Sequence, residues 1–188
     1  MNTWQCCSVH ERVGIRELTR DELSRISEID RTEQIDLIFE QRGTELVARP
    51  GDWSAPAWDQ NGDGEHTVEA QRRALAHYAD DGGIARGAFS QGRLIGIGVM
   101  VPHIRPGIAQ LAYLHVSHDF RGAGVGSRLC ADLEQLAQHA GDTEIVVSAT
   151  PSENTVRFYM ARGYRPLAQP LPELFELEPD DIHMGKVI

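Results

Sequence analysis

Three glycines, Gly122, Gly124 and Gly126, lie within five residues of one another directly after Arg121. Glycine has no Cβ, so the backbone N–H groups of such a segment can approach a ligand closely. If a helix begins here, its first turn adds N–H groups without partners and a partial positive charge. The segment therefore predicts an anion site suited to a pyrophosphate. From the glycines alone, a turn that serves only chain geometry is an equal alternative.

The spacing argues against two other phosphate-binding loops. A dinucleotide-binding loop counted from Gly122 requires glycine at position 127, which holds Ser127. A nucleoside-triphosphate loop requires Gly-Lys-Ser or Gly-Lys-Thr, and the single lysine of the chain is Lys186. A nucleotide-dependent oxidoreductase is therefore not supported.

The elements that must position this loop follow from hydrophobic periodicity. A strand is expected at 110–116 before the loop, and an apolar stripe through Val125, Leu129 and Leu133 predicts an amphipathic helix over 124–140 after it. The remaining expectations are strands at 13–18, 35–40, 44–49, 84–89, 94–101, 144–149, 164–167 and 181–188, helices at 20–29, 67–79 and 152–162, and loops at 50–65 and 102–107. This order indicates an α/β fold with a mixed sheet in a single domain.

Two motifs carry a family resemblance. The run Arg121-Gly122-Ala123-Gly124-Val125-Gly126 matches the R/Q-x-x-G-x-G/A motif of the GNAT acetyltransferases, and Phe158-Tyr159-Met160-Ala161-Arg162-Gly163-Tyr164 resembles the F-Y-x-x-x-G-F element of that family. The resemblance implies a mostly antiparallel mixed sheet flanked by helices. It also implies a division into an N-terminal arm at 1–12 and one domain at 13–188. Within that domain it implies a variable substrate-side part at 13–80, an acetyl-CoA-binding core at 84–167 and a C-terminal strand region at 168–188.

The same resemblance implies which residues bind acetyl-CoA. Backbone groups from Arg121 to Gly126 would hold the pyrophosphate, and the main chain near His115 would hold the pantetheine arm and the acetyl carbonyl. Tyr159 would protonate the departing thiolate, since a phenol keeps its proton at neutral pH; the alternative for Tyr159 is a core aromatic residue. The full set of expected cofactor contacts is Leu114, His115, Val116, Arg121, Gly122, Ala123, Gly124, Val125, Gly126, Ser127, Ser152, Asn154, Phe158 and Tyr159.

One position departs from the family pattern. Members often carry Asn seven residues before the tyrosine, where this chain has Ser152. Ser152 shares a helix face with Tyr159 and can cap the helix as Asn would. Asn154 lies well round the helix from that face, and it is kept among the candidate contacts.

A substrate ammonium must lose a proton before attack, so a base is expected, directly or through water. The candidates are Glu33, His115 and His118. Glu33 is alternatively a solvated carboxylate, and His115 is alternatively a structural histidine on the strand face opposite Leu114 and Val116. No metal site is expected, because the two histidines have no third ligand in view.

The overall charge narrows the expected partners. The chain has 28 acidic and 18 basic residues and a formal net charge of −10, which disfavours nucleic acid and favours a neutral or cationic amine. No apolar run approaches the roughly 20 residues that span a bilayer, and no secretion signal is recognised, so a cytoplasmic location without membrane contact is expected. A homodimer is compatible with these expectations.

The resemblance implies an N-acetyltransferase that moves an acetyl group from acetyl-CoA to a primary amine of a small molecule or peptide, by direct attack in a ternary complex. The alternative is a non-catalytic acyl-CoA-binding sensor or partner protein with the same fold.

Overall fold

The structure is a computed structural model that describes residues 13–188; the expected N-terminal arm at 1–12 lies outside the described residues. Seven strands form one sheet in the order β1-β4-β5-β6-β7-β9-β8, and β2 and β3 form a separate hairpin. The strands are β1 (Gly14–Glu17), β2 (Glu33–Arg42), β3 (Glu45–Ala55), β4 (Ile84–Ser90), β5 (Arg93–Arg105), β6 (Ile108–Val116), β7 (Glu144–Ala149), β8 (Arg165–Pro166) and β9 (Ile182–Val187). The helices are η1 (Arg20–Glu28), α1 (Val68–Asp80), η2 (His118–Phe120), α2 (Val125–Ala140), α3 (Glu153–Met160) and α4 (Pro172–Leu177). The expected α/β fold with a mixed, mostly antiparallel sheet is confirmed, since β6 and β7 form the one parallel pair in the described sheet.

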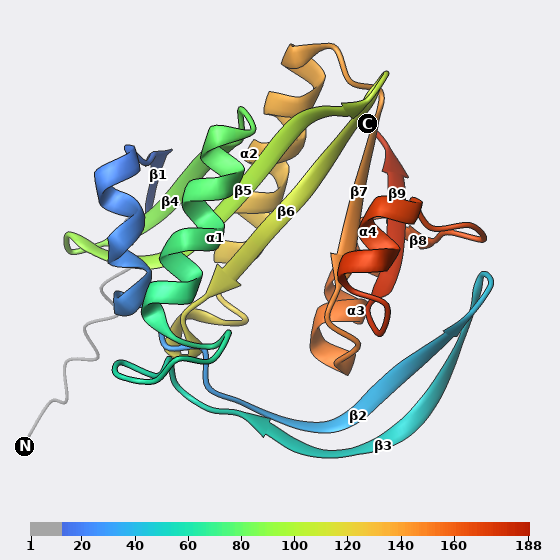
Figure 1. Ribbon diagram of the computed structural model, residues 1–188, viewed down its shortest axis with the longest axis horizontal. Helices are drawn as coiled ribbons and strands as arrows, with labels where there is room; N and C mark the ends of the chain where they lie inside the picture. Colours follow the sequence, from blue (N-terminus) through green and yellow to red (C-terminus); the bar gives the residue numbers. More distant parts are fainter. Residues whose placement is uncertain (1–12) are drawn as a thin grey trace, which may run out of the picture.

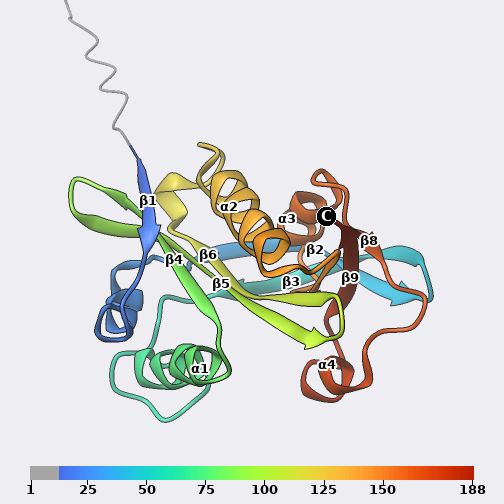
Figure 2. The same cartoon turned by 90° about the horizontal axis from the view of Figure 1, so that it is seen from above.

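Helices cover both faces of this sheet. Figure 2 shows α2 and α3 on one side, and α1 and α4 on the other. Leu129 and Leu133 of α2 are fully buried against the first face, whereas Ile26 of η1 and Leu75 of α1 are buried against the second. Both faces are therefore apolar, which explains the nearly continuous run of buried residues along β5.

Strands β6 and β7 pair only where they begin. Ile108 to Gln110 pairs with Glu144 to Val146, and the pairing then stops although both strands continue (Figure 1). We call the space between the unpaired parts, 111–116 and 147–149, the β6–β7 opening. Strand edges carry backbone donors and acceptors that need partners. The opening therefore suits an extended ligand that can bind along a strand edge.

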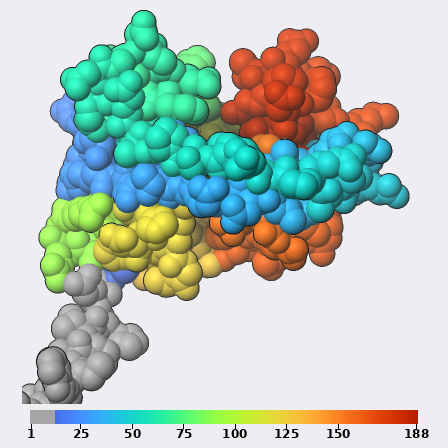
Figure 3. Space-filling model, turned by 90° about the horizontal axis from the view of Figure 1, so that it is seen from below, coloured from blue at the N-terminus to red at the C-terminus, as the bar shows by residue number. Residues whose placement is uncertain are grey.

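The β2–β3 hairpin crosses the wide end of this opening and forms a continuous band over that face of the molecule (Figure 3). On the β7 side, the N–H of Phe39 donates to the Pro151 carbonyl at 2.8 Å. On the β6 side, just before β2, the N–H of His118 donates to the Asp30 carbonyl at 2.8 Å. The hairpin thus joins the two halves of the sheet at the end where they do not pair with each other.

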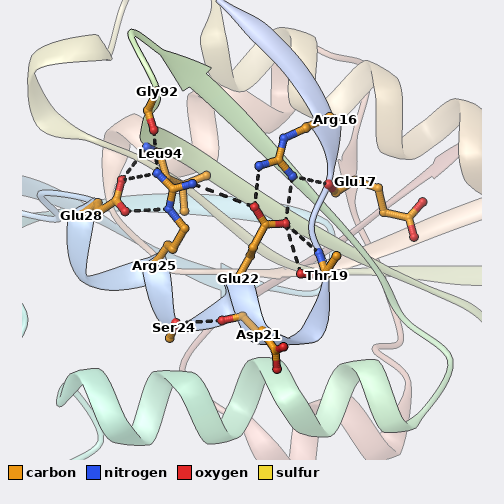
Figure 4. A network of polar contacts seen from close by, with 10 residues as sticks. All are labelled: Arg16, Glu17, Thr19, Asp21, Glu22, Ser24, Arg25, Glu28, Gly92 and Leu94. Carbon is orange, nitrogen blue, oxygen red and sulfur yellow. Dashed lines mark hydrogen bonds and ion pairs between the residues drawn. The ribbon is translucent and has the colours of Figure 1, made fainter.

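A polar network fixes the segment that leads into β2 (Figure 4). The Arg25 guanidinium forms an ion pair with Glu28 and donates to the Gly92 carbonyl at 2.6 Å. The Glu28 carboxylate also accepts from the N–H of Leu94 at 2.7 Å. These contacts hold η1 on the β4–β5 turn, so that the chain leaves the helix at a defined point close to Asp30.

Most expected elements are present, and the differences have local causes. The expected loop at 50–65 is wrong over 50–55, because β3 continues to Ala55 by pairing with β2 across a bulge between Ile35 and Leu37. β5 likewise extends into the expected loop at 102–107, and η1 is a 3-10 helix. Helix α4 was not expected; it is one short turn-and-a-half that begins at Pro172 and is anchored by buried Leu174.

Candidate active site

The glycine segment forms an open turn at the start of α2. Gly122 and Gly124 have positive φ values of 74° and 80°, and a Cβ on either would meet no atom within 4 Å. The first helical hydrogen bond of α2 is donated by Arg128 to the Gly124 carbonyl. Among residues 13–188, nothing accepts a hydrogen bond of ordinary geometry from the backbone N–H groups of residues 122–127. Six N–H donors at the start of a 16-residue helix thus have no partner among the described residues, which is a geometry suited to an anion.

The Arg121 side chain anchors this loop to neighbouring segments. Its guanidinium donates to the Val116 carbonyl at 3.1 Å, to the Thr32 carbonyl at 3.2 Å and to the Arg31 carbonyl at 3.2 Å, and it pairs with Glu33 at 3.0 Å. These four contacts connect the end of β6 to the start of β2. The side chain of Arg121 therefore positions the loop, while the backbone of the loop remains free to bind.

Glu33 joins the starts of two helices. One carboxylate oxygen accepts from Arg121, next to α2, and the other accepts from Asn154 Nδ2 at 2.9 Å in the first turn of α3. Ser152 caps α3, as its sequence position predicts, because its hydroxyl accepts from the N–H of Thr155 at 3.3 Å. The structure thus brings Glu33, Arg121 and the first turn of α3, with Ser152 and Asn154, together at the wide end of the β6–β7 opening.

Tyr159 lies on α3 with only 4% of its surface exposed, between the rings of Phe158 and Tyr164 at centroid distances of 5.1 and 5.2 Å. No described residue forms a hydrogen bond with its hydroxyl, yet this oxygen is not one of the buried polar atoms without a partner, so it keeps access to solvent. Burial raises the pKa of Tyr159 well above its usual value, and the negative charge of Asp181 raises it further. The phenol therefore stays protonated at neutral pH.

His115 faces the opposite side of β6 from α2, as strand alternation predicts. Its ring packs against Trp58 at 5.3 Å and Tyr113 at 4.8 Å, and the Tyr113 hydroxyl donates to Gln71 of α1 at 2.6 Å. Removal from bulk water, helped by the positive charge of Arg31, lowers the pKa of His115 to about 4. The imidazole is therefore neutral at pH 7.

A hollow of about 530 Å³ lies on the other side of the opening, beside β9 and α4. Glu40, Asp180, Asp181, Phe175 and His183 are among its lining residues. Burial raises the pKa of Asp181 to about 7, and the nearby carboxylates of Glu178 and Asp180 raise it in the same direction.

The expected site residues fall into two groups. The glycine loop, Arg121, Glu33, Ser152 and Asn154 lie near the wide end of the opening, whereas His115 lies on the unpaired part of β6 and Tyr159 packs on α3 against Phe158 and Tyr164. The expected site residues did not include Arg31 and Trp58. Asp181 belongs to the stretch from Glu173 to Asp181, which is rich in acids and free of basic residues; from the sequence, this stretch is either a solvated loop or part of a site for a cationic amine. No group of three described His, Cys, Asp or Glu side chains is arranged to hold a metal ion, and no described helix is long and apolar enough to span a membrane.

The profile of the acetyltransferase (GNAT) family matches residues 48–164 of the chain. No curated protein matches it by sequence. Among solved structures, the chain is similar to nourseothricin acetyltransferase, with a TM-score of 0.69, 16% identity and coverage of 93% of this chain and 98% of that one. It is also similar to the PaiA N-acetyltransferase from Thermoplasma acidophilum in complex with coenzyme A, with a TM-score of 0.61, 15% identity and coverage of 94% and 99%. A third similar structure is a GNAT family acetyltransferase from Elizabethkingia anophelis with acetyl-CoA bound, with a TM-score of 0.53, 17% identity and coverage of 62% and 82%.

Proposed function

Because the chain belongs to the acetyltransferase (GNAT) family, we propose that it moves an acetyl group from acetyl-CoA to a primary amine of a small molecule or peptide, by direct attack in a ternary complex. The observation that carries this proposal is the set of six unpartnered N–H groups beside the β6–β7 opening, with a protonated, unpartnered tyrosine hydroxyl on α3. When bound, acetyl-CoA supplies the acetyl group and a thiolate leaving group.

The residues present fit this cosubstrate. The backbone of residues 121–127 offers N–H donors and the helix N-terminus for a pyrophosphate. The edge of β6 at Leu114 and His115, which no described strand pairs on the β7 side, offers backbone partners for an extended arm. Gly126 lies against the ring of Phe158, since a Cβ there would come within 3.1 Å of it. This contact keeps α2 and α3 close and supports the shape of the loop.

Tyr159 is the proposed general acid. Its raised pKa keeps the proton on the hydroxyl oxygen until the leaving sulfur can accept it. The burial of the ring between Phe158 and Tyr164 restricts the direction in which that hydroxyl can point. A core aromatic with no catalytic role would need no free hydroxyl, and the lack of a described hydrogen-bond partner supports the acid role.

Glu33 and His115 remain the proposed bases for the incoming ammonium. His115 is neutral, but its lowered pKa makes it a weak base at pH 7. Glu33 already accepts from Arg121 and Asn154, so as a base it would act through water or after releasing one of them. The acidic hollow beside Asp181 supports an amine as the acceptor, because carboxylates attract ammonium groups.

The direct test is amine-dependent release of thiol from acetyl-CoA across a broad amine panel, with product identification by mass. The proposal predicts saturable turnover with at least one primary amine and N-acetylation of that amine. CoA binding by calorimetry without turnover on any amine would instead support the non-catalytic acyl-CoA-binding alternative.

A further inference from the structure

Three buried side-chain nitrogens have no hydrogen-bond partner in the part of the chain that the structure describes. They are Nε and Nη1 of Arg31 and Nε1 of Trp58. Buried polar atoms in folded proteins nearly always have a partner, so an exception calls for an explanation. All three atoms carry hydrogen and act only as donors. An acceptor that satisfies them must therefore supply oxygen atoms or a negative charge.

The three donors lie together. The guanidinium carbon of Arg31 is 4.7 Å from the centre of the Trp58 ring, which is a cation–π distance. Trp58 is 93% buried, since only 7% of its surface is exposed. The stacking supports the orientation of the Arg31 side chain while leaving Nε and Nη1 without a partner.

No carboxylate of the described chain forms an ion pair with Arg31. Glu33 is occupied by Arg121 at 3.0 Å and Asn154 at 2.9 Å. Glu65 has an exposed side chain, 87% accessible, and forms no ion pair with Arg31. Burial lowers the pKa of Arg31, which means that the surroundings disfavour its positive charge. The carboxylates of Glu33 and Glu65 attract Arg31 without forming an ion pair with it, so a bound anion would lower the remaining cost of this partly buried charge.

The donors lie beside the face of β6 that is turned away from α2. Trp58 contacts His115, and Tyr113 follows on the same strand face, which is turned away from α2. Both strand residues belong to the part of β6 that no longer pairs with β7. The glycine loop lies at the start of α2, whereas the Arg31 and Trp58 side chains gather on the α1 side of the sheet.

We propose that Arg31 and Trp58 bind a carboxylate group of the amine acceptor, so that the acceptor is an amino carboxylate. This inference rests on the proposed function. One guanidinium balances one negative charge, which fits a carboxylate better than a phosphate dianion. An amino carboxylate with one ammonium group has no net charge, so the chain's net charge of −10 does not repel it overall.

The test compares amino acids with their own amides as acceptors, because each pair differs only in the carboxylate. For the preferred pair we expect kcat/KM to be at least about 10-fold higher for the acid, since a buried charged donor discriminates strongly against a missing partner. Arg31→Gln should lower kcat/KM for the acid by about 10- to 100-fold, mainly through KM, and should change the rate with the amide by less than about 3-fold. Trp58→Phe, which keeps an aromatic ring but is smaller and lacks Nε1, should give a smaller loss in the same direction.

Three controls keep the outcomes separate. Arg73→Gln, on the exposed face of α1, should leave both acceptors unchanged. The affinity of Arg31→Gln for CoA should match that of the wild type; weaker CoA binding would assign the donors to the cofactor and overturn the inference, as would an equal loss for acid and amide. If no amine is acetylated, the proposed function fails. The carboxylate site is then tested separately, by measuring with calorimetry the affinity of the same amino acids for CoA-loaded wild type and CoA-loaded Arg31→Gln. Absence of Arg31-dependent binding there would also overturn it.

Discussion

The two sides of the β6–β7 opening have opposite electrostatic character. On the β6 side, Arg31 and Trp58 present buried donors without partners, and His115 beside them is held neutral. On the β9 side, Asp181 lies with other carboxylates in a hollow, and its own pKa rises to about 7. One side thus disfavours additional positive charge, and the other disfavours additional negative charge.

This difference shows that the net charge of the chain does not determine which charged groups the site can bind. The net charge of −10 describes the long-range field and predicts which molecules approach. The unpaired donors and the crowded carboxylates describe what the site can hold once a molecule arrives. An acceptor that carries both an ammonium and a carboxylate matches both sides, whereas a simple polycation matches only the acidic one.

The largest expected effect concerns Tyr159, the proposed general acid on α3. Tyr159→Phe should lower kcat by about 100- to 10,000-fold, because a positioned general acid contributes that much. CoA affinity should change little, since the ring and its packing remain. Stopped-flow or steady-state thiol release measures the first quantity, and calorimetry measures the second.

Tyr164→Phe is the matched control for this change, because Tyr164 is buried in contact with Tyr159 and its hydroxyl lies 3.8 Å from the sulfur of Cys130. A loss of only a few-fold in Tyr159→Phe, or an equal loss in both variants, would mean that Tyr159 acts through packing.

A smaller effect is expected from Glu33→Gln, which tests the base at the wide end of the opening. If Glu33 takes the ammonium proton, the acetyl-transfer rate should fall by about 10-fold or more at neutral pH, and the loss should shrink as pH rises and free amine becomes abundant. Asn154→Ala, which removes the neighbouring contact but keeps the carboxylate, serves as the control. A loss that is the same at every pH and is accompanied by weaker CoA binding would assign Glu33 to holding Arg121 and Asn154 in place.

The smallest expected effects are on stability, and they have opposite signs on the two sides. The folded pKa of His115 is lowered to about 4, so its contribution to stability is complete above the unfolded pKa and is lost as pH falls from about 6.5 to 4. The folded pKa of Asp181 is raised to about 7, so stability is lost as pH rises from about 4 to 7.

Two variants distinguish the pH dependence of stability due to His115 from that due to Asp181. Asp181→Asn should raise the free energy of unfolding by about 1–2 kcal/mol near pH 8 and change it little near pH 4. His115→Gln should reduce the loss of stability below about pH 6. Urea unfolding across this range measures both. Parallel curves for wild type and Asp181→Asn at all pH values would show that Asp181 is not desolvated, and the contrast between the two sides would then disappear.

The sequence predicts the parts of the site that depend on local geometry. The positive φ values of Gly122 and Gly124, the Ser152 cap and the buried stripe of α2 each follow from neighbours a few residues away. The contacts of Glu33 with Arg121 and Asn154 join segments about 90 and 120 residues apart, and no local pattern encodes them. The same holds for Arg31 and Trp58, which meet only because η1 and the segment after β3 pack on one face of β6.

The secondary structure expected from the sequence is wrong at two places, and each error has a physical reason. Pro50 and Gly51 indicate a loop, but a bulge with one extra residue in β3, between Pro50 and Trp53, allows Pro50 to pair with Leu37 without breaking the hairpin. Helix α4 has only six residues, too few for a hydrophobic period to be recognised, and buried Leu174 anchors it.

The most direct test of the account is to measure CoA affinity and amine-dependent thiol release on the same preparations of wild type, Gly124→Glu and Gly141→Glu. Both glycines have positive φ and open space at Cβ, but Gly124 begins α2 and Gly141 ends it. The account predicts that Gly124→Glu, which places a side chain and a negative charge at the free N–H groups, loses both CoA binding and turnover, whereas Gly141→Glu keeps both. Wild-type CoA affinity in Gly124→Glu would contradict the account, because the unpartnered donors at the start of α2 would then not be the cofactor site.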